Sequence, residues 1–231
     1  VLGQTIFDAQ KVSERLASLP GPVRRGEFTF ATWYSPEANQ VLVEDASIRW
    51  VENPSGPIQI YWEPVPGGAY ILGADTAGEG SDFNVGQVID HLGGEQLCTI
   101  RGRMDEDLFA KQLYCLGKYY NTALVSVEAN FSSYPIRELE RLRYPRQYVR
   151  QTEDSFTHRI RQSYGFKTSS VTRPLVIAGL VEVVREHPDW LNDRDTLNEM
   201  LTFVRNESGR PEAQQGAHDD CVMSLAIAYY V

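Results

Sequence analysis

Three short apolar runs, separated only by turn residues, constrain the fold of this chain more than any other feature. Residues 69–74 form an apolar run that ends at Asp75, and the runs 85–92 and 95–101 follow with only two glycines between them. Runs of this length are typical of buried strands, and a two-glycine connection is typical of a tight hairpin turn. The sequence therefore predicts three consecutive strands joined by tight turns.

Strand and helix patterns alternate over the rest of the chain. A helix is predicted from its cap at Asp105 through Tyr119, with Leu108, Leu113 and Leu116 facing inward. The other predicted elements are a strand over 123–127, a helix over 134–142, a short strand over 147–150, a helix over 172–187, a strand or hairpin within 197–214 and a closing helix after 218. This order predicts an α/β fold with a mixed central sheet flanked by helices.

The first part of the chain carries weaker patterns. Apolar residues at helical spacing predict a short amphipathic helix within 4–19. Strand-like pieces follow at 40–44, 47–51 and 58–62. A stretch rich in Pro and Gly over 64–68 then marks a boundary. We therefore expect an N-terminal arm or extension over 1–66, packed on a main domain over 67–231.

Charge is unevenly distributed along the chain. The 231 residues have a net charge of -9 and a pI near 5.0, which argues against a nucleic-acid partner for the chain as a whole. Residues 135–167 nevertheless contain eight basic residues against four acidic ones, a charge of +4, so the remainder carries -13. This Arg-rich segment could hold a phosphate backbone, although charge alone is more typical of a solvated helical face.

Three widely separated cysteines, Cys98, Cys115 and Cys221, lack the spacing of a zinc site. We expect them to be free, buried thiols in a reducing compartment. Residues 1–10 are too mixed for a signal peptide, and no stretch approaches the roughly 18 apolar residues of a membrane span. These patterns predict a cytosolic protein that is neither secreted nor bound to a membrane.

Acidic residues stand where two buried strands end and where the last helix begins. Asp75 follows the first apolar run, Glu128 follows the predicted strand 123–127, and Asp219-Asp220 precede the closing helix. Ligand sites of open α/β sheets lie at the carboxyl ends of strands, so these acids could meet in one crevice. Each acid alone has another explanation, because acids also form turns and stabilise helix N-termini.

Crowded carboxylates raise one another's pKa and repel unless a cation neutralises them. Mg²⁺ and Mn²⁺ are hard ions that prefer oxygen ligands. Two such ions can activate a water and stabilise the leaving oxygen during cleavage of a phosphodiester. The acids therefore favour a hydrolytic site that needs no cysteine or serine nucleophile.

Four stretches carry a family resemblance: YILGADTAG at 70–78, VSVEAN at 125–130, YGFKT at 164–168 with TRPL at 172–175, and GAHDDCVMSLA at 216–226. In this order they resemble the nuclease domain of bacteriophage large terminase subunits, in the ribonuclease-H-like superfamily. The resemblance covers most of the chain. It implies a ribonuclease-H-like sheet and a metal-dependent endonuclease that cuts concatemeric viral DNA when packaging starts and ends.

The resemblance also implies roles for individual acids. Asp75, Glu128 and Asp220 would be the catalytic ligands of two Mg²⁺ or Mn²⁺ ions. Asp219 would be a further metal ligand or, like His218, a supporting residue. The expected reaction is two-metal hydrolysis of a phosphodiester.

One position departs from the family pattern. Some relatives carry a further carboxylate three residues after the second Asp of the closing motif, and here that position is Met223. Any fourth ligand would then come from elsewhere in the chain, and the candidates are Asp219, Glu79 and Asp82.

Partners follow from the same resemblance. The substrate would be double-stranded DNA, with candidate phosphate contacts at Arg143, Arg146, Arg150, Lys167 and Arg173. Large terminases begin with an ATPase, yet this sequence has no GxxxxGK[ST] phosphate loop, so we expect a fragment without ATPase activity. Its implied partners are the missing N-terminal ATPase domain, the portal protein and the small terminase subunit, in the bacterial host cytoplasm.

Two alternative hypotheses remain. A structure-selective resolvase or ribonuclease H of the same superfamily would prefer branched DNA or an RNA–DNA hybrid. A docking module of the packaging motor would use the same acids only as caps. Mn²⁺ would then fail to raise its melting temperature, because a bound ion stabilises a fold by mass action.

Overall fold

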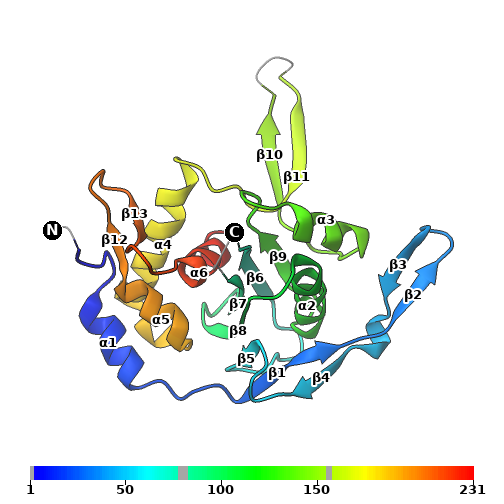
Figure 1. Cartoon of the computed structure of the whole chain (residues 1–231), viewed down its shortest axis with the longest axis horizontal. Coiled ribbons are helices and arrows are strands. Elements are labelled where there is room, and N and C mark those ends of the chain that lie inside the picture. The colour runs from blue at the N-terminus through cyan, green and yellow to red at the C-terminus, as the bar shows by residue number, and fades with distance from the viewer. Residues whose placement is uncertain (1–2, 78–82, 155–157) are drawn as a thin grey trace.

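The computed structural model describes residues 3–77, 83–154 and 158–231, and its main feature is a seven-stranded sheet (Figure 1). The helices are α1 (Ala9–Ala17), α2 (Glu106–Tyr119), α3 (Tyr134–Arg141), α4 (Thr172–Glu186), α5 (Arg194–Leu201) and α6 (Asp220–Tyr230), with short 3-10 helices η1 (Asp45–Ser47) and η2 (Pro188–Trp190). The strands are β1 (Arg24–Thr29), β2 (Thr32–Ser35), β3 (Gln40–Val43), β4 (Arg49–Glu52), β5 (Ile58–Ile60), β6 (Tyr70–Asp75), β7 (Asn84–Asp90), β8 (Gln96–Gly102), β9 (Leu124–Val127), β10 (Val149–Glu153), β11 (Ile160–Tyr164), β12 (Phe203–Arg205) and β13 (Pro211–Ala213). The order in the main sheet is β4-β1-β5-β8-β7-β6-β9.

Strands β6, β7 and β8 correspond to the three apolar runs of the sequence, and all residues of β6 are buried. β7 pairs antiparallel with β6 and with β8, whereas β9 lies parallel to β6. Parallel neighbours need a crossover connection, and α2 lies in the segment that supplies it. Asp105 caps α2 by accepting a hydrogen bond from the Leu108 backbone N–H at 2.7 Å. The predicted mixed α/β sheet flanked by helices is confirmed.

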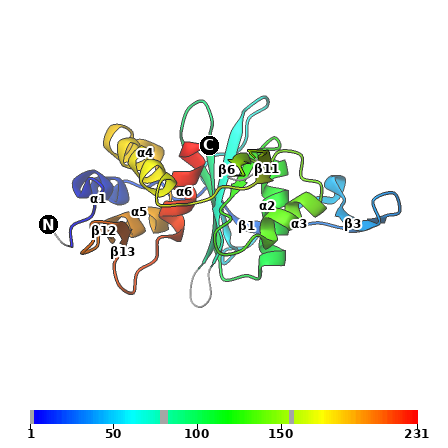
Figure 2. The same cartoon turned by 90° about the horizontal axis from the view of Figure 1, so that it is seen from above.

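Helices cover both faces of the sheet (Figure 2). α2 and α3 pack on one face, where Leu72 belongs to an apolar core. α1, α4, α5 and α6 cover the other face, where Ile71 packs with Leu225 in a second core. Side chains of a strand alternate between the two faces, so Gly73 and Asp75 lie on the α6 side together with Ile71.

The described part of 1–66 extends the main sheet. β5 is hydrogen-bonded to β8, and β1 and β4 continue the sheet beyond it. The β2–β3 hairpin projects away from the sheet (Figure 1). Backbone hydrogen bonds therefore join the predicted extension to the main domain, and the boundary between residues 66 and 67 stays a prediction about how the chain divides.

Two details differ from the predictions. Residues 197–201, expected within a strand or hairpin, belong to α5, because Asp193 caps a helix there by accepting from the Thr196 backbone N–H at 2.8 Å. The predicted hairpin is restricted to β12 and β13. Leu108 is 44% exposed although it was expected to face inward. It stands five residues before the buried Leu113, which places the two side chains well apart around the helix axis.

The three cysteines are free and buried, as predicted. Burial raises the pKa of the Cys98 and Cys221 thiols, so both thiols stay protonated at neutral pH. Over the described residues, no helix combines the length and the apolar character needed to cross a membrane.

Candidate metal centre

Parallel pairing of β6 and β9 brings two acids together at the end of the sheet. Ala74 and Val127 are register partners, and the Glu128 backbone N–H donates to the Ala74 carbonyl at 2.8 Å. Partners in a parallel pair point to the same face, so the following residues, Asp75 and Glu128, both project toward α6. Two acids that are 53 positions apart in the sequence therefore become neighbours.

Gly73 brings the third acid into the same place. A Cβ on Gly73 would collide with the Ser224 carbonyl of α6 and would lie 2.7 Å from the Ala228 backbone nitrogen. Only glycine allows α6 to pack this closely on β6. Asp220 is the first residue of α6, and the close approach holds it on the face of the sheet that carries Asp75.

All three acids are buried, with exposed fractions of 6% for Asp75, 4% for Glu128 and 8% for Asp220. The pKa of Asp75 is raised well above its usual range, first by burial and then by the charge of Glu128 and a hydrogen bond with it. Asp220 and Asp219 add smaller contributions of the same sign. These shifts show that the acids are close enough to repel one another.

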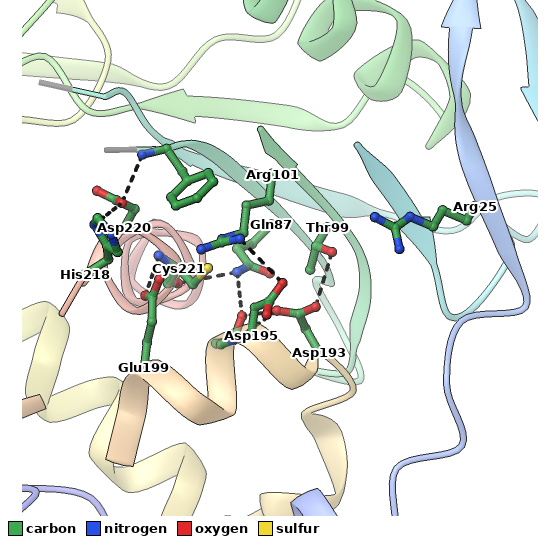
Figure 3. Close-up of polar contacts among 12 residues, drawn as sticks. Arg25, Gln87, Thr99, Arg101, Asp193, Asp195, Glu199, His218, Asp220 and Cys221 are labelled. Carbon is green, nitrogen blue, oxygen red and sulfur yellow. Dashed lines mark hydrogen bonds and ion pairs between the residues drawn. The ribbon is translucent and has the colours of Figure 1, made fainter. Parts of the chain in front are cut away.

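The residues at the start of α6 already have protein partners. The Asp220 carboxylate accepts a hydrogen bond from the Phe83 backbone N–H at 3.2 Å and lies 3.9 Å from His218 Nδ1 (Figure 3). His218 also packs edge-on against the Phe83 ring. Asp219 forms an ion pair with Arg173 at 2.7 Å. His218 thus supports Asp220 directly, whereas Asp219 is neutralised by an arginine.

The acids line one cavity of about 1080 Å³. Asp75, Glu128, Asp219 and Asp220 form part of its wall, together with Met223. Other residues that line it are Thr76, Asn130, Thr168, Arg173, Arg185, Arg205 and Arg210. The hydroxyls of Thr76 and Thr168 are buried there without a hydrogen-bond partner among the described residues. A buried hydroxyl without a partner costs free energy, so the cavity is suited to a polar occupant.

The donor set fits a divalent cation by its chemistry. Carboxylate oxygens are the ligands that Mg²⁺ and Mn²⁺ prefer, and a cation would relieve the repulsion that raises the pKa of Asp75. In the described ranges, however, no three His, Cys, Asp or Glu side chains are already arranged to hold one ion. Asp219 and Asp220 face Arg173 and the Phe83 N–H instead. Side-chain rotation at the start of α6 would therefore accompany binding.

The candidates for a fourth ligand divide into two groups. Glu79 and Asp82 lie outside the described residues. Met223, which replaces the carboxylate of some relatives, is buried and lines the cavity one helical turn after Asp220. Its thioether is a poor ligand for a hard cation.

The predicted DNA contacts lie in different places. Among the five candidates, only Arg173 lines the cavity. Lys167 is exposed directly after Phe166, whose backbone bridges to Glu128. Arg150 donates to the Tyr164 and Gly165 carbonyls from the β10–β11 hairpin.

Neither Arg143 nor Arg146 lines the cavity. The Arg146 side chain donates to the carbonyl of Thr122, which precedes β9, whereas Glu128 follows this strand. Six residues of extended chain separate Thr122 from Glu128 by about 20 Å. The structure thus does not bring Arg146 to the acids.

Sequence reasoning did not identify several residues that line the cavity. Arg205 and Arg210 flank the β12–β13 turn, and Arg185 lies near the end of α4. Thr76 directly follows Asp75, and Thr168 ends the YGFKT stretch, so a search for polar residues beside the predicted ligands would have found both. Only the packing of the hairpin beside α4 places the three arginines.

No family model matches the chain, and no curated protein matches it. Solved structures do. The nuclease domain of the large terminase from thermophilic phage G20c is 24% identical over 77% of this chain and 89% of that chain, with a TM-score of 0.58. The same nuclease with bound magnesium is 23% identical over 77% of this chain and 88% of that chain, with a TM-score of 0.59. The Thermus phage P74-26 large terminase nuclease domain is 24% identical over 77% of this chain and 86% of that chain, with a TM-score of 0.56. The chain therefore has the ribonuclease-H-like fold of large terminase nuclease domains.

Proposed function

We propose that this protein is a metal-dependent DNA endonuclease that cuts concatemeric viral DNA at the start and end of genome packaging. The observation that carries this proposal is the convergence of Asp75, Glu128 and Asp220, from β6, β9 and the start of α6, on one cavity. The similarity in fold to large terminase nucleases supports it, as does the structure of one such nuclease with bound magnesium.

The three acids would hold two Mg²⁺ or Mn²⁺ ions. Such ions supply a Lewis acid and lower the pKa of a bound water. The protein contributes the position of each carboxylate, since Glu128 is fixed by its backbone bond to Ala74 and Asp220 by the packing of α6 on Gly73. Arg173 neutralises Asp219 and so limits the negative charge that the ions must balance. Thr76 and Thr168 also line this cavity.

The biological setting follows from the same similarity. We propose double-stranded DNA as the substrate and, as partners, an ATPase domain of the same subunit, the portal protein and the small terminase subunit, in the cytoplasm of the bacterial host. Arg143, Arg146, Arg150, Lys167 and Arg173 remain candidate phosphate contacts. Arg173 and Lys167 are favoured by their positions beside the acids.

Plasmid cleavage tests the proposal. Supercoiled plasmid is incubated with the wild type and with Asp75→Asn, with Mn²⁺ or with EDTA. We expect cutting only by the wild type with Mn²⁺, because loss of a ligand removes the ions that drive the reaction. Asp8→Asn is the matched control, since Asp8 caps α1 and Asn caps equally well.

Equal cutting by wild type and Asp75→Asn would refute the assignment. A strong preference for branched DNA or an RNA–DNA hybrid over linear duplex would instead indicate a resolvase or ribonuclease H.

A further inference from the structure

The cavity that holds the acids also has a basic end. It continues between α4 and the β12–β13 turn, where Arg205 and Arg210 line it. The acids and these arginines thus share one continuous space of about 1080 Å³. A single ligand could contact both ends.

The two arginines of the turn differ from the other arginines of this cavity. Arg173 is paired with Asp219, and Arg185 is paired with Glu186. Within the described ranges Arg205 and Arg210 form no ion pair, and Arg205 only donates to the Gly209 carbonyl at 3.0 Å. Glu212 is the carboxylate on the hairpin side of the wall, and Glu207 of the turn does not line the cavity, so the lining of this end carries more positive than negative charge.

The turn that carries the arginines is internally braced. Asn206 Oδ1 accepts hydrogen bonds from the backbone N–H groups of Ser208 and Arg210, at 3.0 and 2.9 Å. Arg173 Nη2 donates to the Pro211 carbonyl at 3.4 Å, which ties the hairpin to α4. A ligand at this end would meet a largely preformed surface and would lose little free energy in ordering it.

A second observation concerns unsatisfied donors. Thr168 is 9% exposed, and its hydroxyl lacks a partner in the described structure, as does the buried Arg173 Nε–H. Both residues line the cavity between its two ends. Donors that lack acceptors, beside unpaired guanidinium groups, favour an anionic ligand rich in oxygen.

We infer that the basic end binds a backbone phosphate of the DNA strand whose neighbouring phosphodiester lies at the acids, so that this strand runs along α4 toward the β12–β13 turn. The inference rests on the proposed function, because it takes the acids as the site of cleavage. It places the strand away from Arg146, which lies at the opposite end of β9.

DNA affinity of two charge-reversal variants tests this path. Arg210→Glu changes the basic end, and Arg49→Glu is the matched control, an exposed arginine of β4 at the edge of the main sheet opposite β9. Binding of a labelled duplex is measured by fluorescence anisotropy in EDTA, so that no cleavage occurs. We expect the Kd of Arg210→Glu to rise by about five-fold or more, and that of Arg49→Glu to change by less than about two-fold. Arg210→Ala should lower the slope of log K against log salt by about 0.9.

Equal effects of the two reversals, or a larger effect at Arg49, would overturn the inference. Melting temperatures of both variants exclude unfolding as the cause, and Arg210→Ala replaces Arg210→Glu if the latter melts early. Plasmid cleavage separates the two proposals. If Asp75→Asn cuts like the wild type while Arg210→Glu still binds weakly, the nuclease site is wrong but the basic end remains a DNA-binding subsite.

Discussion

Two groups of buried carboxylates lie on either side of the start of α6, and they differ in what surrounds them. On α5, Asp193 is 2% exposed and accepts hydrogen bonds from the Tyr61 hydroxyl at 2.8 Å and from the Thr196 N–H and hydroxyl. Glu199 accepts from the Cys221 N–H of α6 at 2.8 Å (Figure 3). It also accepts from the Val222 N–H at 3.1 Å. Donors therefore contact both carboxylates of this group, and Glu199 Oε1 is the one buried oxygen of the pair without a hydrogen-bond partner among the described residues.

In the cavity, the neighbours of the buried carboxylates are other acids. Asp75 faces Glu128, and the charges of Asp220 and Asp219 raise its pKa further. Burial also raises the pKa of Asp193 and Glu199, and hydrogen bonds from their neighbours offset part of this rise, which leaves the pKa of Glu199 at about 7. Burial therefore does not distinguish a structural acid from a ligand acid. The neighbouring groups distinguish the two kinds of acid. Hydrogen-bond donors hold a carboxylate in place, whereas further acids repel it unless a cation binds.

The largest expected effect comes from removing one acid of each group. Asp193→Ala leaves Tyr61 and Thr196 without their acceptor, so we expect a loss of about 3–5 kcal/mol in the free energy of unfolding. Asp75→Asn removes the repulsion between the Asp75 carboxylate and the neighbouring acids. The metal-free variant should therefore be at least as stable as the wild type. Urea unfolding in EDTA measures both changes. A large loss of stability in Asp75→Asn would contradict the proposed difference between the two groups of acids.

A smaller effect is expected at the cap of α6. Glu199→Leu leaves the Cys221 and Val222 N–H groups without an acceptor, and we expect a loss of about 2 kcal/mol. Glu199→Gln keeps an acceptor oxygen and should lose about half as much. Urea unfolding gives the stabilities, and the rise in melting temperature with Mn²⁺ shows whether the start of α6 still positions Asp220. Identical results for the two variants would mean that Glu199 does not act as a cap.

The smallest effect per step is a drift of stability with pH, at most about 1.4 kcal/mol per pH unit for each titrating group. Burial raises the folded-state pKa of Glu199 from 4.5 to about 7, and the pKa of Asp75 is raised as well. A raised pKa gives stability that is present below the unfolded pKa and is lost as the pH rises through the folded pKa. Metal-free protein should therefore become less stable from pH 4.5 to above 7. Melting temperatures measured across this pH range test which group causes the loss. Glu199→Gln should remove the part of the pH dependence that Glu199 causes. Mn²⁺ should remove the part that Asp75 causes.

Local patterns in the sequence predicted the ligand strands. Asp75 and Glu128 each end an apolar run, and such runs specify buried strands without knowledge of distant contacts. The two strands therefore depend on residues close in the chain. The parallel pairing that makes the two acids neighbours joins segments 53 positions apart, so it depends on the fold as a whole.

Contacts between distant segments were beyond local patterns. Arg173 pairs with Asp219 across 46 positions, and Gly73 admits α6 because of a packing distance that a sequence does not state. The same holds for Arg210, which reaches the cavity only because the β12–β13 hairpin lies beside α4. The charged residues with the strongest local signal, in 135–167, lie mostly outside the cavity for this reason.

Anomalous diffraction from crystals grown with Mn²⁺ tests the central claim most directly, because it locates the ion without reference to activity. The account predicts anomalous peaks bounded by the carboxylates of Asp75, Glu128 and Asp220, and their loss in Asp75→Asn crystals. A map with no peak among these three acids, from crystals in which Mn²⁺ binds elsewhere on the protein, would contradict it.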